Sequence, residues 1–205
     1  MASSQSGQQS SSKRVLFLGY NRDQTSLIDV LSEAGCDVDH SVDPIEEVDY
    51  DLIVSFGYRH IISQNTLNRI TCPIMNLHIS YLPYNRGAHP GFWSFFDDTP
   101  SGVTIHLIDD GLDTGPVIYQ RKVTFDAGEV TFADAHRRLV SEIEDLFVVH
   151  LDELLTGKWR AVPQCGEGTK HYVKDLPREF AGWNSEIETE IARLREIIEG
   201  QNGNR

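Results

Sequence analysis

Apolar residues fall into short blocks along the first eighty positions, and each block has the length of a strand or a helix. The run from Arg14 to Gly19 is almost wholly apolar and ends in glycine, as a buried strand does before a turn. From Asp23 to Gly35 the apolar positions recur at helical spacing, and Gly35 is a stop signal. The pattern therefore predicts a β-turn-α opening. The same reasoning predicts strands around Val38, at 50–56 and at 73–78, and a short helix at 63–70.

The pattern changes after residue 100, where two β-rich runs precede long amphipathic segments. The runs at 102–108 and 116–125 flank a loop that is rich in aspartate and glycine. A long helix is expected to begin at Thr131, a good N-cap residue, and to end near Gly157. After a polar stretch, a final helix is expected from Asn184. Its apolar positions are Ile187, Ile191, Leu194 and Ile198, a stripe that fits either the core or a partner subunit.

Strands alternate with helices in the first half of the chain, which predicts an α/β fold built on a mostly parallel, Rossmann-like sheet flanked by helices. A flexible tail is expected at 1–13, because this Ser/Gln-rich stretch has no apolar segment. We expect a catalytic domain at 14–160. A small C-terminal extension, a hairpin or loop plus a helix, is expected at 161–205, packed on the same domain. Ligands of such sheets bind beyond the carboxyl ends of the strands, which is where Asn76 and His78 fall.

The composition narrows the classes of function. With 205 residues, 40% of them hydrophobic, the chain can bury one good core. The formal net charge of −13 argues against nucleic acid as a partner, because that affinity depends on Lys and Arg at phosphates. No segment has the length of a membrane span or the pattern of a signal peptide, so no membrane partner is expected. Cys36, Cys72 and Cys165 lack paired spacing, which predicts reduced thiols and a cytoplasmic location.

Three polar residues with complementary chemistry lie in the apolar middle of the chain. Asn76 and His78 alternate at the end of the predicted strand 73–78, and Asp113 lies in the acidic loop between the two later runs. An amide donor, an imidazole and a carboxylate can stabilise an oxyanion and move a proton without a metal. Taken singly, each has a plainer explanation: a turn residue, a strand-end histidine and an Asx turn. Their combination favours catalysis.

The motifs around these residues form a long ordered series. It comprises Asn76-x-His78, Ser80-Tyr81-Leu82-Pro83, Arg86-Gly87 and Asp109-Asp110-Gly111-Leu112-Asp113-Thr114-Gly115. From about residue 14 to 160 the chain resembles the formyltransferases that use 10-formyltetrahydrofolate, the family of glycinamide ribonucleotide transformylase, methionyl-tRNA formyltransferase and the sugar N-formyltransferases. The loop Tyr81-Leu82-Pro83-Tyr84-Asn85-Arg86-Gly87 with Thr104-Ile105-His106 is most similar to enzymes that formylate a nucleotide-linked amino sugar. The resemblance implies catalytic roles for Asn76, His78 and Asp113.

The resemblance also implies a binding site for the formyl donor, 10-formyltetrahydrofolate. Its pterin would sit between two backbone segments, which fall on Tyr58-Arg59-His60-Ile61 and on Ile108-Asp109-Asp110. Backbone groups suit a pterin edge, which presents donors and acceptors in one plane, while apolar neighbours exclude water. The alternatives are an ordinary solvated loop at Arg59 and His60, and a core position for Ile61.

Acceptor binding is expected near the catalytic strand and at a small basic cluster. Arg86 and His89 lie in a loop flanked by glycine and proline, and a fixed guanidinium suits a phosphate or carboxylate. Lys170, His171 and Lys174 form the basic cluster, at a place where the resemblance to sugar formyltransferases implies a Tyr-His pair. No metal site is expected, because the histidines at 60, 78, 89 and 106 lack the spacing of common zinc ligands.

Together these observations predict an N-formyltransferase that moves a formyl group from 10-formyltetrahydrofolate to the primary amine of a nucleotide-linked amino sugar. The alternatives are a phosphoribosylglycinamide formyltransferase, a non-catalytic folate-binding module and a formyl-folate hydrolase. The loop from Tyr81 to Gly87 speaks against the first, and the intact Asn76, His78 and Asp113 set speaks against the second. The acidic net charge disfavours a tRNA acceptor. By analogy with sugar formyltransferases, a homodimer is expected.

Overall fold

Six strands form the central sheet of the computed structural model, which describes residues 12–46, 48–125 and 130–202. The strands are β1 (Arg14–Gly19), β2 (Asp37–Ser41), β3 (Leu52–Phe56), β4 (Ile74–His78), β6 (Gly102–Leu107) and β7 (Val117–Lys122), in the spatial order β2-β1-β3-β4-β6-β7. β1 to β4 pair in parallel, whereas β6 and β7 run antiparallel to their neighbours. The expected α/β fold with a mostly parallel sheet is confirmed. Residues 1–11 of the expected tail lie outside the described residues.

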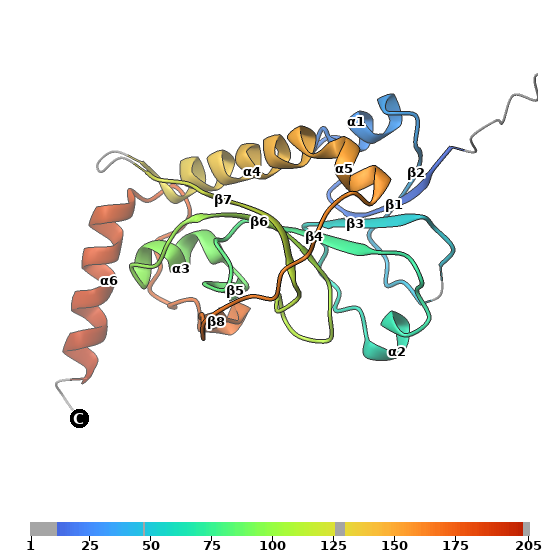
Figure 1. Ribbon diagram of the computed structural model, residues 1–205. Helices are drawn as coiled ribbons and strands as arrows, with labels where there is room; N and C mark the ends of the chain where they lie inside the picture. Colours follow the sequence, from blue (N-terminus) through green and yellow to red (C-terminus); the bar gives the residue numbers. More distant parts are fainter. Residues whose placement is uncertain (1–11, 47, 126–129, 203–205) are drawn as a thin grey trace, which may run out of the picture.

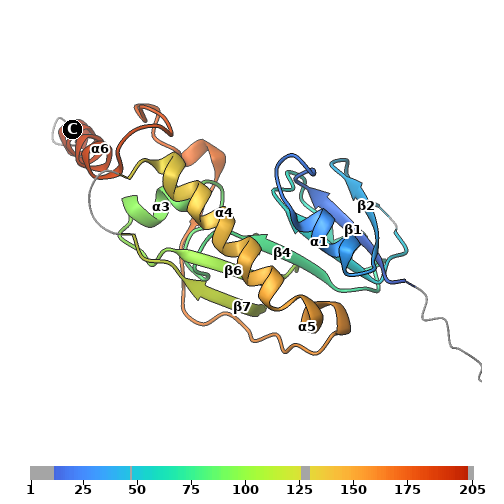
Figure 2. The same ribbon diagram turned by 90° about the horizontal axis from the view of Figure 1, so that it is seen from above.

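Both faces of the sheet are covered, as the apolar run in β1 requires. Val15 packs in the cluster shared with α1 (Leu27–Glu33) and α4 (Phe132–Val149), whereas Leu16 packs in a second cluster on the opposite face, near α2 (Gln64–Leu67). Figures 1 and 2 show α1 and α4 on one side of the sheet, and Figure 1 shows α2 on the other. A strand that is buried on both faces has apolar residues at successive positions rather than at alternate ones.

Two helices are shorter than the sequence predicts. The segment after β1 forms a turn in which the N–H groups of Gln24 and Thr25 donate to the Asn21 carbonyl, so α1 begins at Leu27 instead of Asp23. The predicted helix at 63–70 contains only the four residues of α2.

The long helix begins as expected but is interrupted near its end. Thr131 and Asp134 form a reciprocal capping box, in which each side chain accepts the other residue's backbone N–H. α4 ends at Val149, and after His150 the chain continues as α5 (Leu151–Thr156). Gly157 follows with a φ of 73°, the left-handed conformation that ends many helices.

A third apolar cluster builds one end of the molecule. It joins α3 (Pro90–Phe96), the start of α4 and α6 (Ile187–Asn202). The buried members are Phe92, Trp93, Phe132, Ala135, Ile187, Ile191 and Leu194. Three positions of the predicted α6 stripe are therefore core positions. α6 begins three residues later than expected, and its far end projects from the molecule (Figures 1 and 2).

A small parallel pairing, which no periodic pattern predicts, links the C-terminal segment to the loop after β4. β5 (Arg86–Gly87) pairs with β8 (Lys170–His171), and a 3-10 helix, Val173–Asp175, follows. Gly87 has a φ of 90°, and a Cβ added there would lie 2.2 Å from the His171 carbonyl oxygen, so the approach requires glycine. The segment after residue 160 is thereby held beside the carboxyl end of β4.

Candidate active site

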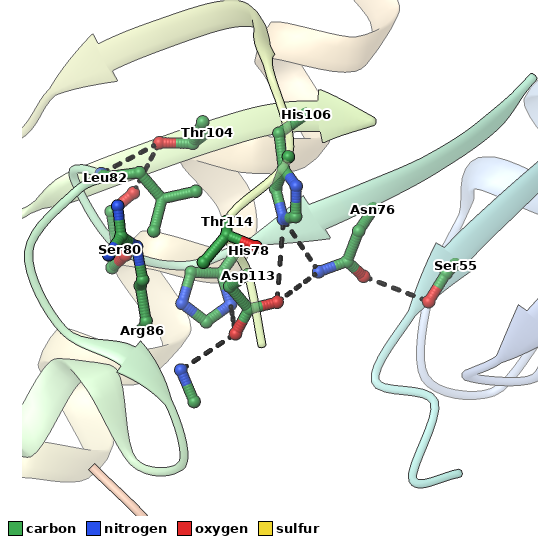
Figure 3. Close-up of polar contacts among 12 residues, drawn as sticks. Ser55, Asn76, His78, Ser80, Leu82, Arg86, Thr104, His106, Asp113 and Thr114 are labelled. Carbon is green, nitrogen blue, oxygen red and sulfur yellow. Dashed lines mark hydrogen bonds and ion pairs between the residues drawn. The ribbon is translucent and has the colours of Figure 1, made fainter. Parts of the chain in front are cut away.

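Asn76 and His78 lie on β4 and point to the same face of the sheet (Figure 3). Leu77, between them, points the other way and belongs to the core under α4. This alternation is the normal geometry of a strand. Ser55 of β3 and His106 of β6 occupy the positions opposite Asn76 in the two neighbouring strands. Three adjacent strands therefore each contribute a polar side chain to this place in the sheet.

Asp113 brings the loop between β6 and β7 into this group (Figure 3). Its Oδ2 lies 3.6 Å from His78 Nδ1 and accepts the Gly87 N–H at 2.8 Å. Its Oδ1 accepts an N–H of the Asn76 amide at 3.3 Å. The carboxylate thus makes its hydrogen bonds across the fold and does not close an Asx turn on its own loop.

Two features of Asp113 show that the surrounding structure holds it. Its φ of 52° is a left-handed conformation, which costs a residue other than glycine about 1–3 kcal/mol. Burial alone raises the pKa of its carboxyl, but the nearby His78 and the Gly87 N–H outweigh that effect. The pKa therefore lies well below the ordinary aspartate value. Asp113 presents a fixed negative charge to His78 throughout the neutral range.

His78 is buried between two acceptors. On one side its Nδ1 faces the Asp113 carboxylate, and on the other its Nε2 lies 3.1 Å from the carbonyl oxygen of Asn85. A carbonyl and a carboxylate can only accept, so the surroundings are complementary to an imidazole ring that has a proton on both nitrogens. Asn85 is itself wholly buried and has a φ of 57°.

His106, for which the sequence pattern predicts no role, belongs to the same polar group. Its Nδ1 lies 2.8 Å from the Leu107 carbonyl oxygen and so has the proton, which leaves Nε2 to accept an N–H of Asn76 at 3.1 Å. The same Nε2 lies 3.6 Å from Asp113 Oδ1. A histidine inside the apolar run 102–108 was the available signal. Only the antiparallel pairing of β4 with β6 places it opposite Asn76.

The first predicted folate-binding segment is mostly exposed. Tyr58 donates its hydroxyl to the Asp43 carbonyl at 2.8 Å, and Arg59 and His60 are exposed. The alternative core position for Ile61 is wrong, because its side chain is 89% exposed and the next residue along the chain, Ile62, lies in the core. An isoleucine this exposed is free to contact a ligand.

The second predicted folate-binding segment follows β6 directly. Ile108 donates its N–H to the Ile74 carbonyl and packs on the same apolar cluster as Tyr58, so the two segments border one cluster. The Asp109 carboxylate is engaged within its own loop, where it accepts the Thr114 hydroxyl at 2.6 Å. Asp110 is exposed.

The four predicted acceptor-binding residues do not converge on one point. Arg86 donates to the side-chain oxygen of Gln164 through Nη2 at 2.7 Å and Nε at 3.1 Å. His89 lies with its ring 5.3 Å from that of Trp183, and burial lowers its pKa. Lys170 pairs with Arg86 in the β5–β8 register, so these two lie side by side.

His171 faces the interior. Its ring stacks on Trp93 with centroids 3.9 Å apart, and its Nε2 lies 3.0 Å from Asp97 Oδ2. Its side chain is 15% exposed. Lys170, in contrast, is exposed, with its ammonium 5.5 Å from the ring centre of Tyr172. Of the predicted basic cluster, Lys170 and Lys174 thus remain at the surface.

Within residues 12–46, 48–125 and 130–202, no group of three or more His, Cys, Asp or Glu side chains has the arrangement of a metal site. No helix in the same part of the chain has the length and apolar character needed to cross a membrane.

The molecule is similar to a solved enzyme of known ligands. A formyltransferase from Anoxybacillus kamchatkensis, solved in complex with UDP-4,6-dideoxy-4-formamido-L-AltNAc and tetrahydrofolate, is 38% identical to this chain, with a TM-score of 0.78. The match covers 85% of this chain and 96% of that enzyme.

Curated relatives are also similar to this chain, but the matches cover a smaller share of each protein. A dTDP-4-amino-4,6-dideoxyglucose formyltransferase of Mycobacterium bovis is 34% identical over 141 residues, which are 69% of this chain and 58% of the relative. A methionyl-tRNA formyltransferase of Halorhodospira halophila is 37% identical over 125 residues, 60% of this chain and 40% of that protein. The chain thus spans less than two thirds of either relative.

The Formyl transferase family matches residues 20–150, a range that contains Asn76, His78 and Asp113. This range is more than half of the 205 residues, and it includes the parallel strands β2, β3 and β4, while β1 ends just before it at Gly19. The chain belongs to the formyl transferase family.

Proposed function

We propose that this protein is an N-formyltransferase that transfers a formyl group from 10-formyltetrahydrofolate to the primary amine of a nucleotide-linked amino sugar. The observation that carries the proposal is the meeting of Asn76, His78 and Asp113 at the carboxyl end of β4, within the matched family region. Two similar proteins support the ligand classes. The Anoxybacillus enzyme was solved with tetrahydrofolate and a UDP-linked formamido sugar, and the Mycobacterium relative is named for a dTDP-linked amino sugar.

The reaction makes a separate demand on each of three atoms. The amine nitrogen attacks the formyl carbon, the carbonyl oxygen takes up negative charge, and the nitrogen must lose a proton. When the tetrahedral intermediate collapses, the bond between this carbon and N10 of the folate breaks, and N10 takes up a proton. The products are tetrahydrofolate and a formamido sugar. Hydrogen-bond donors at the oxygen and a proton carrier near the nitrogen lower the barrier.

Asn76, His78 and Asp113 supply these functions. We assign Asn76 as a donor to the developing oxyanion and His78 as a donor or proton carrier. Asp113 orients the His78 ring and stabilises a positive charge on it. One oxyanion donor is typically worth about 3 kcal/mol of barrier. In the structure both N–H groups of the Asn76 amide already donate, to His106 at 3.1 Å and to Asp113 at 3.3 Å. The formyl oxygen must therefore replace one of these acceptors.

We assign the folate to the segments 58–61 and 108–110. The shared apolar cluster under Tyr58 and Ile108, together with the exposed Ile61, supports this assignment. For the acceptor, Arg86, His89 and Lys170 border the loop that follows β4. The same four-residue prediction included His171. Its packing against Trp93 favours an indirect contribution, through the β8 backbone.

The test is a transfer assay with purified protein, 10-formyltetrahydrofolate and a panel of UDP- and dTDP-linked amino sugars. Glycinamide ribonucleotide serves as a competing acceptor and the His78→Ala variant as the control. We expect tetrahydrofolate and one formamido sugar to form in equal amounts with the wild type, and neither with the variant. If only glycinamide ribonucleotide is formylated, the protein is a phosphoribosylglycinamide formyltransferase. Brisk release of formate without an acceptor would assign a hydrolase. Folate binding without transfer to any amine would contradict an enzymatic role.

We also infer a cytoplasmic setting. Cys36, Cys72 and Cys165 are all free thiols, as in proteins of reducing compartments. The homodimer stays a prediction, which sedimentation of the purified protein tests directly.

A further inference from the structure

Gln164 makes four hydrogen bonds through one side-chain amide, and all four go to segments that border the candidate active site. Its Nε2 donates to the carbonyl oxygens of Asp113 at 2.9 Å and Gly115 at 2.8 Å. Its Oε1 accepts from the Arg86 guanidinium at 2.7 and 3.1 Å. The amide therefore uses both of its hydrogens and both lone pairs of its oxygen. No sequence motif singled this residue out.

These bonds close a ring around Asp113. The Asp113 carboxylate accepts the N–H of Gly87, the residue next to Arg86, and Arg86 donates to Gln164. Gln164 in turn donates to the Asp113 carbonyl. Backbone and side chain of the aspartate are thus held from opposite sides by one connected set of residues. A shift of the loop would break bonds at both points.

Asp113 needs such support because of its conformation. Its φ of 52° is unfavourable for a side chain, and its carboxylate must stay 3.6 Å from His78 Nδ1 to act on that ring. The Asp113 and Gly115 carbonyls flank Thr114 in this loop. Gln164 donates to both, so it holds the backbone on each side of Thr114. The segment that contains Gln164 is anchored independently, by two backbone hydrogen bonds between Val162 and Val117 at 2.8 Å.

We propose that Gln164 is a positioning residue for formyl transfer. Its amide holds the Asp113 loop in the conformation that directs the carboxylate at His78, and it joins this loop to Arg86 in the acceptor loop. The inference rests on the proposed function for its kinetic consequence, but the positioning itself is independent of the substrate. Gln164 acts through Asp113 and does not contact the reacting atoms.

Two substitutions separate the halves of the amide. Gln164→Met keeps the length of the side chain and removes all four hydrogen bonds. Gln164→Glu keeps an acceptor for Arg86 but places an oxygen against the Asp113 and Gly115 carbonyls, so it removes only the loop support. Glu167→Gln is the matched control, because Glu167 offers Arg86 only its backbone carbonyl and its side chain is exposed. All three are compared with the wild type in thermal unfolding, steady-state kinetics and imidazole ¹⁵N spectra.

We expect kcat to fall at least tenfold in both Gln164 variants, with the KM for the formyl donor little changed, and the His78 ring signals to shift without any substrate. Glu167→Gln should match the wild type in all three measurements. Wild-type kcat in either Gln164 variant, or unchanged His78 signals, would overturn the proposal. Loss of the fold in both variants would assign Gln164 a structural role instead, and would equally overturn it. If the wild type transfers no formyl group, the proposed function fails, while the spectra still decide whether Gln164 positions the loop.

Discussion

Replacing Asp113 by asparagine keeps the shape of the side chain but changes what it can accept. The carboxylate takes the Gly87 N–H at one oxygen and an Asn76 N–H at the other. An amide has one acceptor oxygen and one donor NH₂ group. In either orientation, a donor of the new residue faces a donor of Gly87 or of Asn76. The Asp113→Asn variant therefore loses a negative charge and one of these two hydrogen bonds.

The distance between Asp113 and His78 sets the size of the expected fall in kcat. Asp113 Oδ2 lies 3.6 Å from His78 Nδ1, and at an effective dielectric constant of about 20 two unit charges at that distance attract by about 4–5 kcal/mol. Solvent reaches 14% of the Asp113 side chain and screens part of this energy. Since about 1.4 kcal/mol corresponds to a tenfold change in rate, we expect kcat to fall by about 10²–10³. Asp113 acts on the His78 ring, which takes part in transfer and not in folate binding, so the KM for the formyl donor should change little.

The assay is steady-state transfer at saturating donor and acceptor, together with chemical denaturation at two pH values. The pKa of Asp113 is lowered in the folded protein, so its charge contributes stability above the ordinary aspartate pKa of about 4 and loses that contribution as the pH falls below it. The difference in unfolding free energy between wild type and variant should therefore be larger at about pH 7 than at about pH 3. A variant with wild-type kcat, or with an equal stability difference at both pH values, would refute the reasoning.

Four further predictions address separate parts of the molecule. Asn76→Ala should lower kcat by about 10²-fold or more while folate binding, measured by fluorescence titration, stays near wild type, because the lost donor acts on charge that develops only during transfer. His106→Leu leaves an Asn76 N–H without its acceptor, so thermal unfolding should show a loss of about 1–3 kcal/mol, together with a reduced kcat; an unchanged melting temperature would speak against the pairing. Leu139→Ala removes a core side chain of α4 and should cost about 2–5 kcal/mol in urea unfolding, whereas Val149→Ala, at a position of α4 that is 69% exposed, should change stability by less than about 0.5 kcal/mol. EDTA should leave transfer untouched, because amide, imidazole and carboxylate supply the chemistry; activity that is lost in EDTA and restored by zinc would reveal a metalloenzyme.

The strands of the central sheet could be predicted because the apolar pattern of each one reflects which of its faces are buried. β1 is apolar at successive positions since both faces of the sheet are covered, and β4 alternates at its end since only one face there is polar. The ends of the helices were harder to predict from the sequence. The apolar stripe of α4 continues through Leu151 and Leu154 of α5, so periodicity alone does not reveal the break at His150. Likewise, the turn after β1 depends on bonds to the Asn21 carbonyl that helical spacing does not indicate.

Part of the candidate site follows from sequence, and part depends on long-range pairing. Asn76, His78 and Asp113 could be selected because their residue types fit one reaction and their motif is specific. His106 joins them only because β6 runs antiparallel beside β4, and strand order leaves no local signal. Gln164 is more remote still. It reaches Arg86 from a segment that the isolated bridge between Val162 and Val117 holds, and a single bridge leaves no periodic pattern in the sequence.

Ser55 shows how a buried polar residue can set the direction of the whole group. It is 3% exposed in the apolar strand β3, and its hydroxyl donates to Asn76 Oδ1 at 3.0 Å. This bond fixes the orientation of the Asn76 amide, because the oxygen must face β3 and the NH₂ group must then face His106 and Asp113. The orientation of the Asn76 amide is therefore set before any substrate arrives, and the formyl oxygen only has to replace His106 or Asp113 as the acceptor of one N–H. A serine in the middle of Leu52–Phe56 is best explained by this constraint on Asn76, since burying a hydroxyl that served no such partner would only destabilise the sheet.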